Sequence, residues 1–110
     1  MDAAVLEQLR AVLGDAGLIS DPTRLSAYEC DGLALLQQRP AVVVLPRTTE
    51  QCARAMAVLH RAGIPVVGRG AGTGLSGGAT PVQGGAIVGL ARMRDIVAID
   101  VENRTARVQA

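Results

Sequence analysis

The stretch Ile64-Pro-Val-Val-Gly-Arg-Gly-Ala-Gly-Thr-Gly-Leu-Ser-Gly-Gly-Ala79 joins a short apolar segment to a run dominated by glycine. Its apolar part, residues 64–67, is typical of a strand. Its glycine part, residues 68–79, has little side-chain bulk and wide backbone freedom, so its amide N–H groups can turn together toward one anion. A buried strand that opens into such a loop is a common place for a nucleotide to bind.

A strand, a helix and a second strand are predicted before the loop. The continuous apolar run 41–45 is typical of a strand covered on both faces, and Pro46 ends it. Thr48 and Gln51 then match a capping box that begins a helix, which Gly63 ends. With residues 64–67 as the second strand, the sequence predicts a βαβ unit.

The remaining segments are predicted from their periodicity. Residues 2–14 have the apolar spacing of a short helix, whereas residues 18–39 look mostly irregular, with a helix start or a turn at 20–23. Residues 86–90 are expected to form a third strand. Residues 96–99 and 105–109 are expected to form an antiparallel hairpin around a turn at 100–104.

Composition limits the class of protein. The chain has 110 residues, enough for one small domain, and 49% of them are hydrophobic, with one Tyr and no Phe or Trp. A net charge of +1 without a clustered basic face argues against nucleic-acid binding. Two cysteines and one histidine are too few for a closed zinc site, and neither cysteine looks like a nucleophile. With no signal peptide and no membrane-spanning run, we expect a soluble, reduced, intracellular chain.

Three kinds of nucleotide-binding loop are rich in glycine. A P-loop requires a lysine, which the chain lacks. Residues 72–77 match the letters of the Rossmann fingerprint, but the Gly, Pro and Gly-Gly that follow forbid the helix it requires. The third kind wraps a diphosphate with backbone amides, the Thr73 and Ser76 hydroxyls, and Arg69 as a cation near the entrance. A glycine-rich turn without a ligand is the remaining alternative.

Four segments resemble the FAD-linked oxidases of the vanillyl-alcohol-oxidase (PCMH) type. They are the loop 69–79, Pro46-Arg-Thr-Thr-Glu-Gln51, Leu90-Ala-Arg-Met93 and Tyr28-Glu-Cys-Asp-Gly-Leu33. Their spacing is most similar to the branch formed by the FAD-binding subunits of bacterial glycolate oxidases. The resemblance implies a mixed α/β (α+β) PCMH-type domain: an N-terminal segment 1–39, a βαβ subdomain 40–90 with its loop at 68–80, and the start of a second, antiparallel subdomain at 91–110.

The resemblance also implies the cofactor and its binding residues. FAD is expected to bind non-covalently, because Thr73 stands where other branches carry a histidine that bonds to the flavin. The cofactor-binding residues are expected to be the whole loop: Arg69, Gly70, Ala71, Gly72, Thr73, Gly74, Leu75, Ser76, Gly77, Gly78 and Ala79. No catalytic residue and no metal ligand are assigned to the chain.

The expected activity is that of a flavin-dependent oxidoreductase of a 2-hydroxy acid, glycolate or D-lactate. The substrate-binding residues are expected in a C-terminal part beyond residue 110, so that the chain would be the N-terminal piece of a longer protein. Other oxidase subunits, including an iron–sulfur subunit, are the implied partners. The enzyme is expected to be cytoplasmic, with any membrane association made through these partner subunits. The alternatives are a non-catalytic nucleotide-binding or scaffold module and, third, an NAD-binding Rossmann domain.

Overall fold

Two sheets and two main helices make up the computed structural model, which describes residues 1–110. The first half contains α1 (Ala3–Leu13), a 3-10 turn η1 (Asp15–Gly17), β1 (Leu18–Ile19), α2 (Pro22–Leu25), a second 3-10 turn η2 (Ser26–Tyr28) and β2 (Val42–Val44). The second half contains α3 (Thr49–Arg61), β3 (Val66–Arg69), β4 (Ala86–Gly89), β5 (Ile96–Asp100) and β6 (Thr105–Val108).

The larger sheet has the strand order β1-β2-β4-β3. Strand β4 lies in the middle of the parallel part, with Ala86 opposite both Val42 of β2 and Val66 of β3. Strand β1 pairs antiparallel with the other edge of β2. The βαβ unit formed by β2, α3 and β3 is therefore present, with β4 inserted between its two strands.

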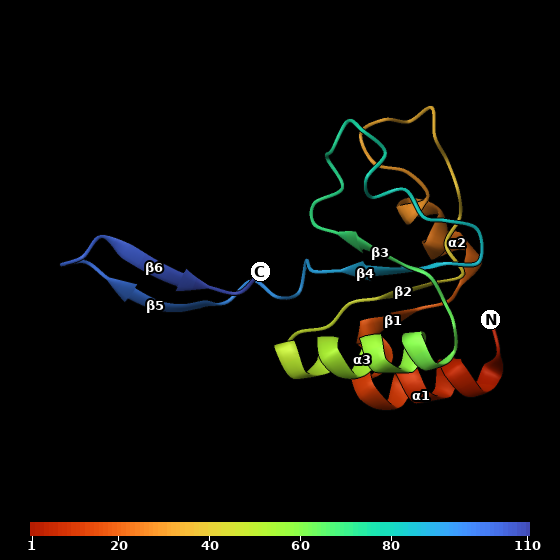
Figure 1. Ribbon diagram of the computed structural model, residues 1–110, viewed down its shortest axis with the longest axis horizontal. Coiled ribbons are helices and arrows are strands. Elements are labelled where there is room, and N and C mark those ends of the chain that lie inside the picture. The colour runs from red at the N-terminus through yellow and green to blue at the C-terminus, as the bar shows by residue number, and fades with distance from the viewer.

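The sheet is covered on both faces, as the apolar run of β2 predicts (Figure 1). Helices α1 and α3 lie side by side on one face, and their Leu9, Leu13 and Leu59 pack against Val42 and Val44 of β2. On the other face a smaller cluster forms from Ile19, Leu25, Val43 and Ile87. All three residues of β2 are fully buried, which explains a run without a polar residue.

Helix α3 begins and ends where the sequence predicts. The Thr48 hydroxyl accepts a hydrogen bond from the Gln51 N–H at 3.1 Å, while the Gln51 side chain accepts one from the N–H of Arg47 at 2.9 Å. The side chain thus reaches one residue further back than a standard capping box requires. At the other end Gly63 has φ +66°, and the N–H of Ile64 closes the helix on the Leu59 carbonyl at 3.0 Å.

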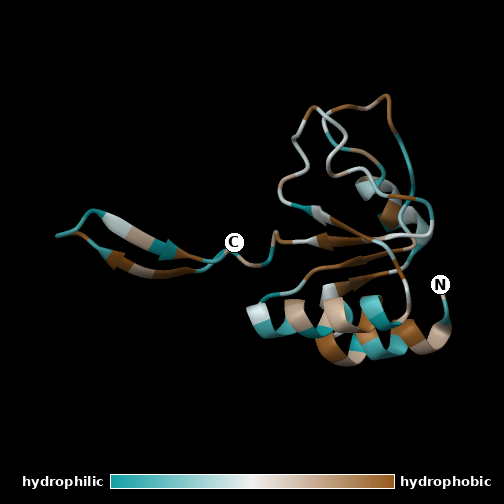
Figure 2. Cartoon of the chain, in the orientation of Figure 1, coloured by the Kyte–Doolittle hydropathy of each residue, from teal (hydrophilic) through white to brown (hydrophobic).

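Strands β5 and β6 form the predicted antiparallel hairpin, which projects from the sheet and its helices (Figures 1 and 2). Every residue of both strands is exposed, including Ile96, Ile99 and Val108. In its turn, the N–H and side-chain amide of Asn103 donate to the Asp100 carboxylate at 3.0 and 2.8 Å. These hydrogen bonds lower the pKa of Asp100 below its ordinary value.

Two local predictions differ from the structure. The second strand begins at Val66 and continues to Arg69, two residues later than expected, because Ile64 is used to close the end of α3. Strand β1 was not predicted, since two residues are too short to show a period. It exists because β2 offers an unpaired edge for it.

Candidate functional site

The glycine loop begins at the carboxyl edge of the parallel strands. Strand β3 ends at Arg69, and the Arg69 carbonyl accepts a hydrogen bond from the N–H of Leu90 at 2.9 Å, one residue beyond β4. The first loop residues therefore lie beside the segment that follows β4. Between them is a cavity of about 330 Å³ lined by Gly70, Ala71, Leu90, Ala91, Arg94 and Ala110.

Unpaired backbone amides run along the whole loop. None of the N–H groups from residue 70 to residue 79 donates a hydrogen bond to an acceptor in the chain. Backbone donors are strongly polar groups that a fold normally pairs with protein, water or ligand. A continuous row of free amides at the end of a strand is an arrangement that can hold an anion.

The loop glycines leave room for close approach to the backbone. At Gly70 and Gly78 a Cβ atom would meet nothing within 4 Å, so their open sides face empty space. Gly72 and Gly77 have φ values of +72° and +75°, a conformation that side chains disfavour. The loop thus fits a diphosphate group, since amides, open glycines and short hydroxyls are all available. No helix follows it before β4, which removes the Rossmann interpretation.

The two predicted hydroxyl donors are free. Thr73 and Ser76 are exposed, and neither side chain makes a hydrogen bond within the chain. Arg69, expected as a cation near the entrance, has contacts within the chain. Its Nη1 donates to the Cys30 carbonyl at 2.7 Å, and its guanidinium lies 5.3 Å from the centre of the Tyr28 ring. The same guanidinium fills the space beside Gly72, where it would collide with a Cβ atom. Arg69 therefore supports the loop by linking Gly72 to the segment that contains Tyr28 and Cys30.

The segment from residue 28 to residue 33 is the second support of the loop. The N–H of Gly32 donates to the Gly74 carbonyl at 2.8 Å, and a Cβ atom on Gly32 would lie only 2.8 Å from that oxygen. Asp31 is 7% exposed; its Oδ1 accepts from the N–H of Leu33 at 2.8 Å, while its Oδ2 is buried without a partner. From its sequence, this segment is expected to be irregular chain on the surface. Its two adjacent turn-forming residues, Asp31 and Gly32, were the available signal for an ordered contact.

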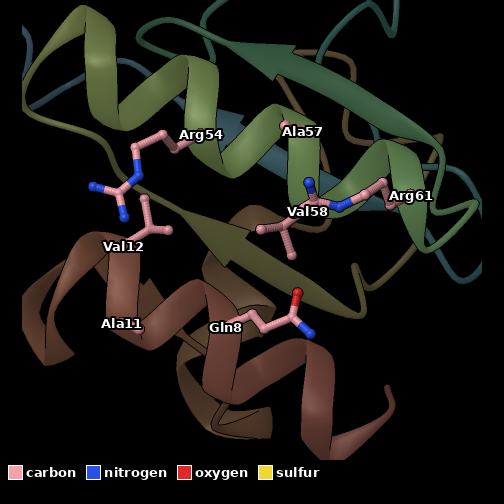
Figure 3. Close-up of a pocket in the computed structure, with 7 residues that line it drawn as sticks. All are labelled: Gln8, Ala11, Val12, Arg54, Ala57, Val58 and Arg61. Carbon is pink, nitrogen blue, oxygen red and sulfur yellow. The ribbon is translucent and has the colours of Figure 1, made fainter.

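The remaining features show no comparable arrangement. A cavity of about 350 Å³ lies between α1 and α3, with Val12 and Val58 on its floor and Arg54 and Arg61 at its sides (Figure 3). It lies on the helical face, away from the glycine loop. No group of three or more His, Cys, Asp or Glu side chains is close enough to hold a metal ion. No helix is both long and apolar enough to cross a membrane.

Known proteins match the chain over most of its length. The model of a family described as FAD binding domain matches residues 40–110. The glycolate oxidase subunit GlcD of Escherichia coli is 44% identical over 106 residues, which cover 96% of this chain and 21% of that protein. GlcD of Bacillus subtilis is 35% identical over 105 residues, 96% of this chain and 22% of that protein. The chain therefore spans about a fifth of the length of these curated relatives.

Solved structures show the same fold. Alkyldihydroxyacetonephosphate synthase matches with a TM-score of 0.85 at 19% identity, over 96% of this chain and 22% of that one. p-Cresol methylhydroxylase, with substrate bound, matches with a TM-score of 0.74 at 27% identity, over 90% of this chain and 20% of that one. The expected mixed α/β fold of the PCMH type is confirmed.

Proposed function

Because the chain belongs to the FAD binding domain family, we propose that it forms the FAD-binding part of a longer oxidoreductase that oxidises a 2-hydroxy acid, glycolate or D-lactate. The observation that carries the proposal is the row of unpaired amides at residues 70–79, placed at the carboxyl edge of a parallel sheet. The 44% identity to a glycolate oxidase subunit supports the substrate class.

Each part of the loop has a distinct task in this proposal. The amides from Gly70 to Gly74 and those of Gly78 and Ala79 hold the diphosphate, and the Thr73 and Ser76 hydroxyls add donors. Leu75, which is 76% exposed, and Gly77 complete the turn of the loop. Arg69 keeps the loop in shape through the Cys30 carbonyl and the Tyr28 ring.

The cofactor is proposed to bind without a covalent bond. Thr73 carries a hydroxyl at the loop position where the resemblance places the flavin-linking histidine of other branches. His60, the one histidine of the chain, is exposed near the end of α3. The chemistry that FAD supplies when bound is acceptance of a hydride from the α-carbon of the hydroxy acid. This chain contributes binding and orientation, and the groups that bind the substrate and take its proton are proposed to lie in the C-terminal part.

The domain division and the partners belong to the same proposal. The hairpin at β5 and β6 is proposed to begin the second subdomain, residues 91–110 here, after the N-terminal segment 1–39 and the βαβ subdomain 40–90. Other subunits, including an iron–sulfur subunit, are proposed to accept the electrons, since the E. coli relative is named as a subunit. The complex is proposed to be cytoplasmic and to reach any membrane through those subunits.

The test begins with the protein encoded by the complete reading frame that contains this chain. The purified protein should show a flavin spectrum, and denaturation in acid should release all of its FAD into the supernatant. Anaerobic addition of glycolate or D-lactate should bleach the flavin, whereas L-lactate serves as the mismatched enantiomer. A colourless protein that binds no added FAD would contradict the proposal. Retention of FAD without bleaching by any 2-hydroxy acid would favour the non-catalytic nucleotide-binding module.

A further inference from the structure

Four arginines lie at the carboxyl edge of the sheet, and they differ in what holds them. Arg69 donates to a backbone carbonyl behind the loop, and the Nη1 of Arg92 donates to the Leu45 carbonyl at 2.9 Å. The guanidinium groups of Arg47 and Arg94 donate no hydrogen bond within the chain and have no carboxylate within 4.0 Å. Both side chains are exposed. Two arginines at this edge are therefore structural, and two are free to bind something else.

The turn that follows β4 places Arg94 near the start of the glycine loop. After β4 the chain turns sharply, because the N–H of Met93 donates to the Leu90 carbonyl at 2.9 Å and the Met93 side chain is buried at 7% exposure. The residue that follows this anchored turn is Arg94. It lines the cavity of about 330 Å³ that also includes Gly70 and Ala71, the first residues with unpaired amides.

A second cavity adjoins the first. Its volume is about 280 Å³, and it is lined by Arg47, Ala91, Arg92 and Arg94. Ala91 and Arg94 line both cavities, so the arginine-rich cavity adjoins the one beside Gly70 and Ala71, where the unpaired amides begin.

Like charges around one cavity favour an anion. Three guanidinium groups line the smaller cavity, and no carboxylate lies within ion-pair distance of any of them. Arginine binds phosphate through two parallel N–H donors, and such charge-assisted hydrogen bonds are about twice as strong as neutral ones. The amides of residues 70–79 and the free arginines thus offer two sets of hydrogen-bond donors that can bind an anion. Arg94 lines the cavity beside each set.

We propose that Arg94 binds the diphosphate of FAD, assisted by Arg47, which lines the same arginine-rich cavity. The other oxygens of the diphosphate then face the amides of the glycine loop. This inference rests on the proposed function. Arg94 then has the cationic role that the sequence predicts for Arg69. The ligand chemistry is that of a phosphate anion, and the source named is the cofactor.

The experiment measures the affinity of the full-length apoprotein for FAD, riboflavin and inorganic pyrophosphate, by flavin fluorescence and by competition. Arg94→Gln and Arg47→Gln are compared with Arg54→Gln, which removes another exposed arginine, from the helical face. Arg94→Gln should weaken FAD binding by about tenfold or more, and Arg47→Gln should weaken it less. Riboflavin, which has no phosphate, should bind all variants equally. Arg54→Gln should match the wild type, and the melting temperature of the apoprotein should not change.

Several results would overturn the inference. Binding of FAD by Arg94→Gln within twofold of the wild type would do so, as would an equal loss for riboflavin. Loss of pyrophosphate binding with unchanged FAD binding would assign the cavity to a free anion. A lower melting temperature without a flavin-specific effect would make Arg94 a structural ion-pair partner in the longer protein. If the wild-type apoprotein binds no FAD, the proposed function itself fails, which is a different outcome.

Discussion

Replacing Gly72 by alanine tests how the glycine loop is held. Gly72 has φ +72°, a region that costs a residue with a Cβ atom about 1–2 kcal/mol. The new Cβ atom would also collide with the Arg69 guanidinium, whose Nε would lie 2.7 Å away. Arg69 would have to leave the Cys30 carbonyl and the Tyr28 ring, contacts worth about 1.5–3 kcal/mol and about 0.5–1 kcal/mol respectively.

Taken at their lower ends, these terms sum to about 3 kcal/mol, which corresponds to a rise of about a hundredfold in the FAD dissociation constant. The assay is titration of the full-length apoprotein with FAD, followed by flavin fluorescence. In an Arg69→Ala background only the backbone strain remains, so Gly72→Ala should then raise the constant by about 5- to 30-fold. The double-mutant cycle should therefore show coupling of about 2 kcal/mol.

A matched control separates strain from collision. Gly84 has the same φ of +72°, but a Cβ atom there would meet nothing within 4 Å. Gly84→Ala should lower the free energy of unfolding by the cost of a Cβ atom at positive φ, without changing the affinity for FAD. Equal effects of Gly72→Ala with and without Arg69 would refute the packing argument. The substitution would then act on the cofactor directly.

Three further predictions concern the loop, its support and the hairpin. Gly70→Ala should leave the melting temperature of the apoprotein unchanged, because the new Cβ atom would meet only open space. The substitution should nevertheless weaken FAD binding about tenfold or more. Unchanged FAD affinity would place the diphosphate elsewhere. Gly32→Ala puts a Cβ atom 2.8 Å from the Gly74 carbonyl oxygen and should cost about 1–3 kcal/mol. The loss should appear as faster hydrogen exchange of the amide at residue 32, which donates to that carbonyl, and protection equal to the wild type would argue against the support. Because the pKa of Asp100 is lowered in the fold, its carboxylate stabilises the turn above the ordinary aspartate pKa, and this contribution is lost as the pH falls through the lowered pKa. An NMR titration of Asp100 and the Asn103 amide checks this, and a midpoint at or above the ordinary value would contradict it.

The elements were largely predictable because local signals and tertiary needs agree. The apolar run of β2, the Thr48 cap of α3 and the Gly63 that ends it each have a local physical cause, and all three stand where the sequence predicts. The order β1-β2-β4-β3 was not predictable from such signals. Which strand inserts between two others depends on contacts between segments far apart in the chain.

The candidate site divides in the same way. A glycine-rich loop with Thr73 and Ser76 was visible as a phosphate site, because its lack of side chains is itself the chemical signal. Arg69 was predicted to be an entrance cation, and the sequence could not show that its guanidinium contacts the Cys30 carbonyl and the Tyr28 ring, because a side chain's direction depends on its partners. Arg94 carried no signal in the sequence at all.

By itself, the sequence established a βαβ unit, a diphosphate-type glycine loop without a following helix, and the family resemblance that the comparisons confirm. These follow from composition and spacing along the chain. The assembly of the site depends on the folded chain: segment 28–33 supports the loop, Arg69 donates to the Cys30 carbonyl, and Arg94 lines the same cavity as Gly70. The physical reason is that these amides and guanidinium groups find their partners only when segments far apart in the chain come into contact. Such long-range contacts cannot be predicted from the order of residues in one sequence.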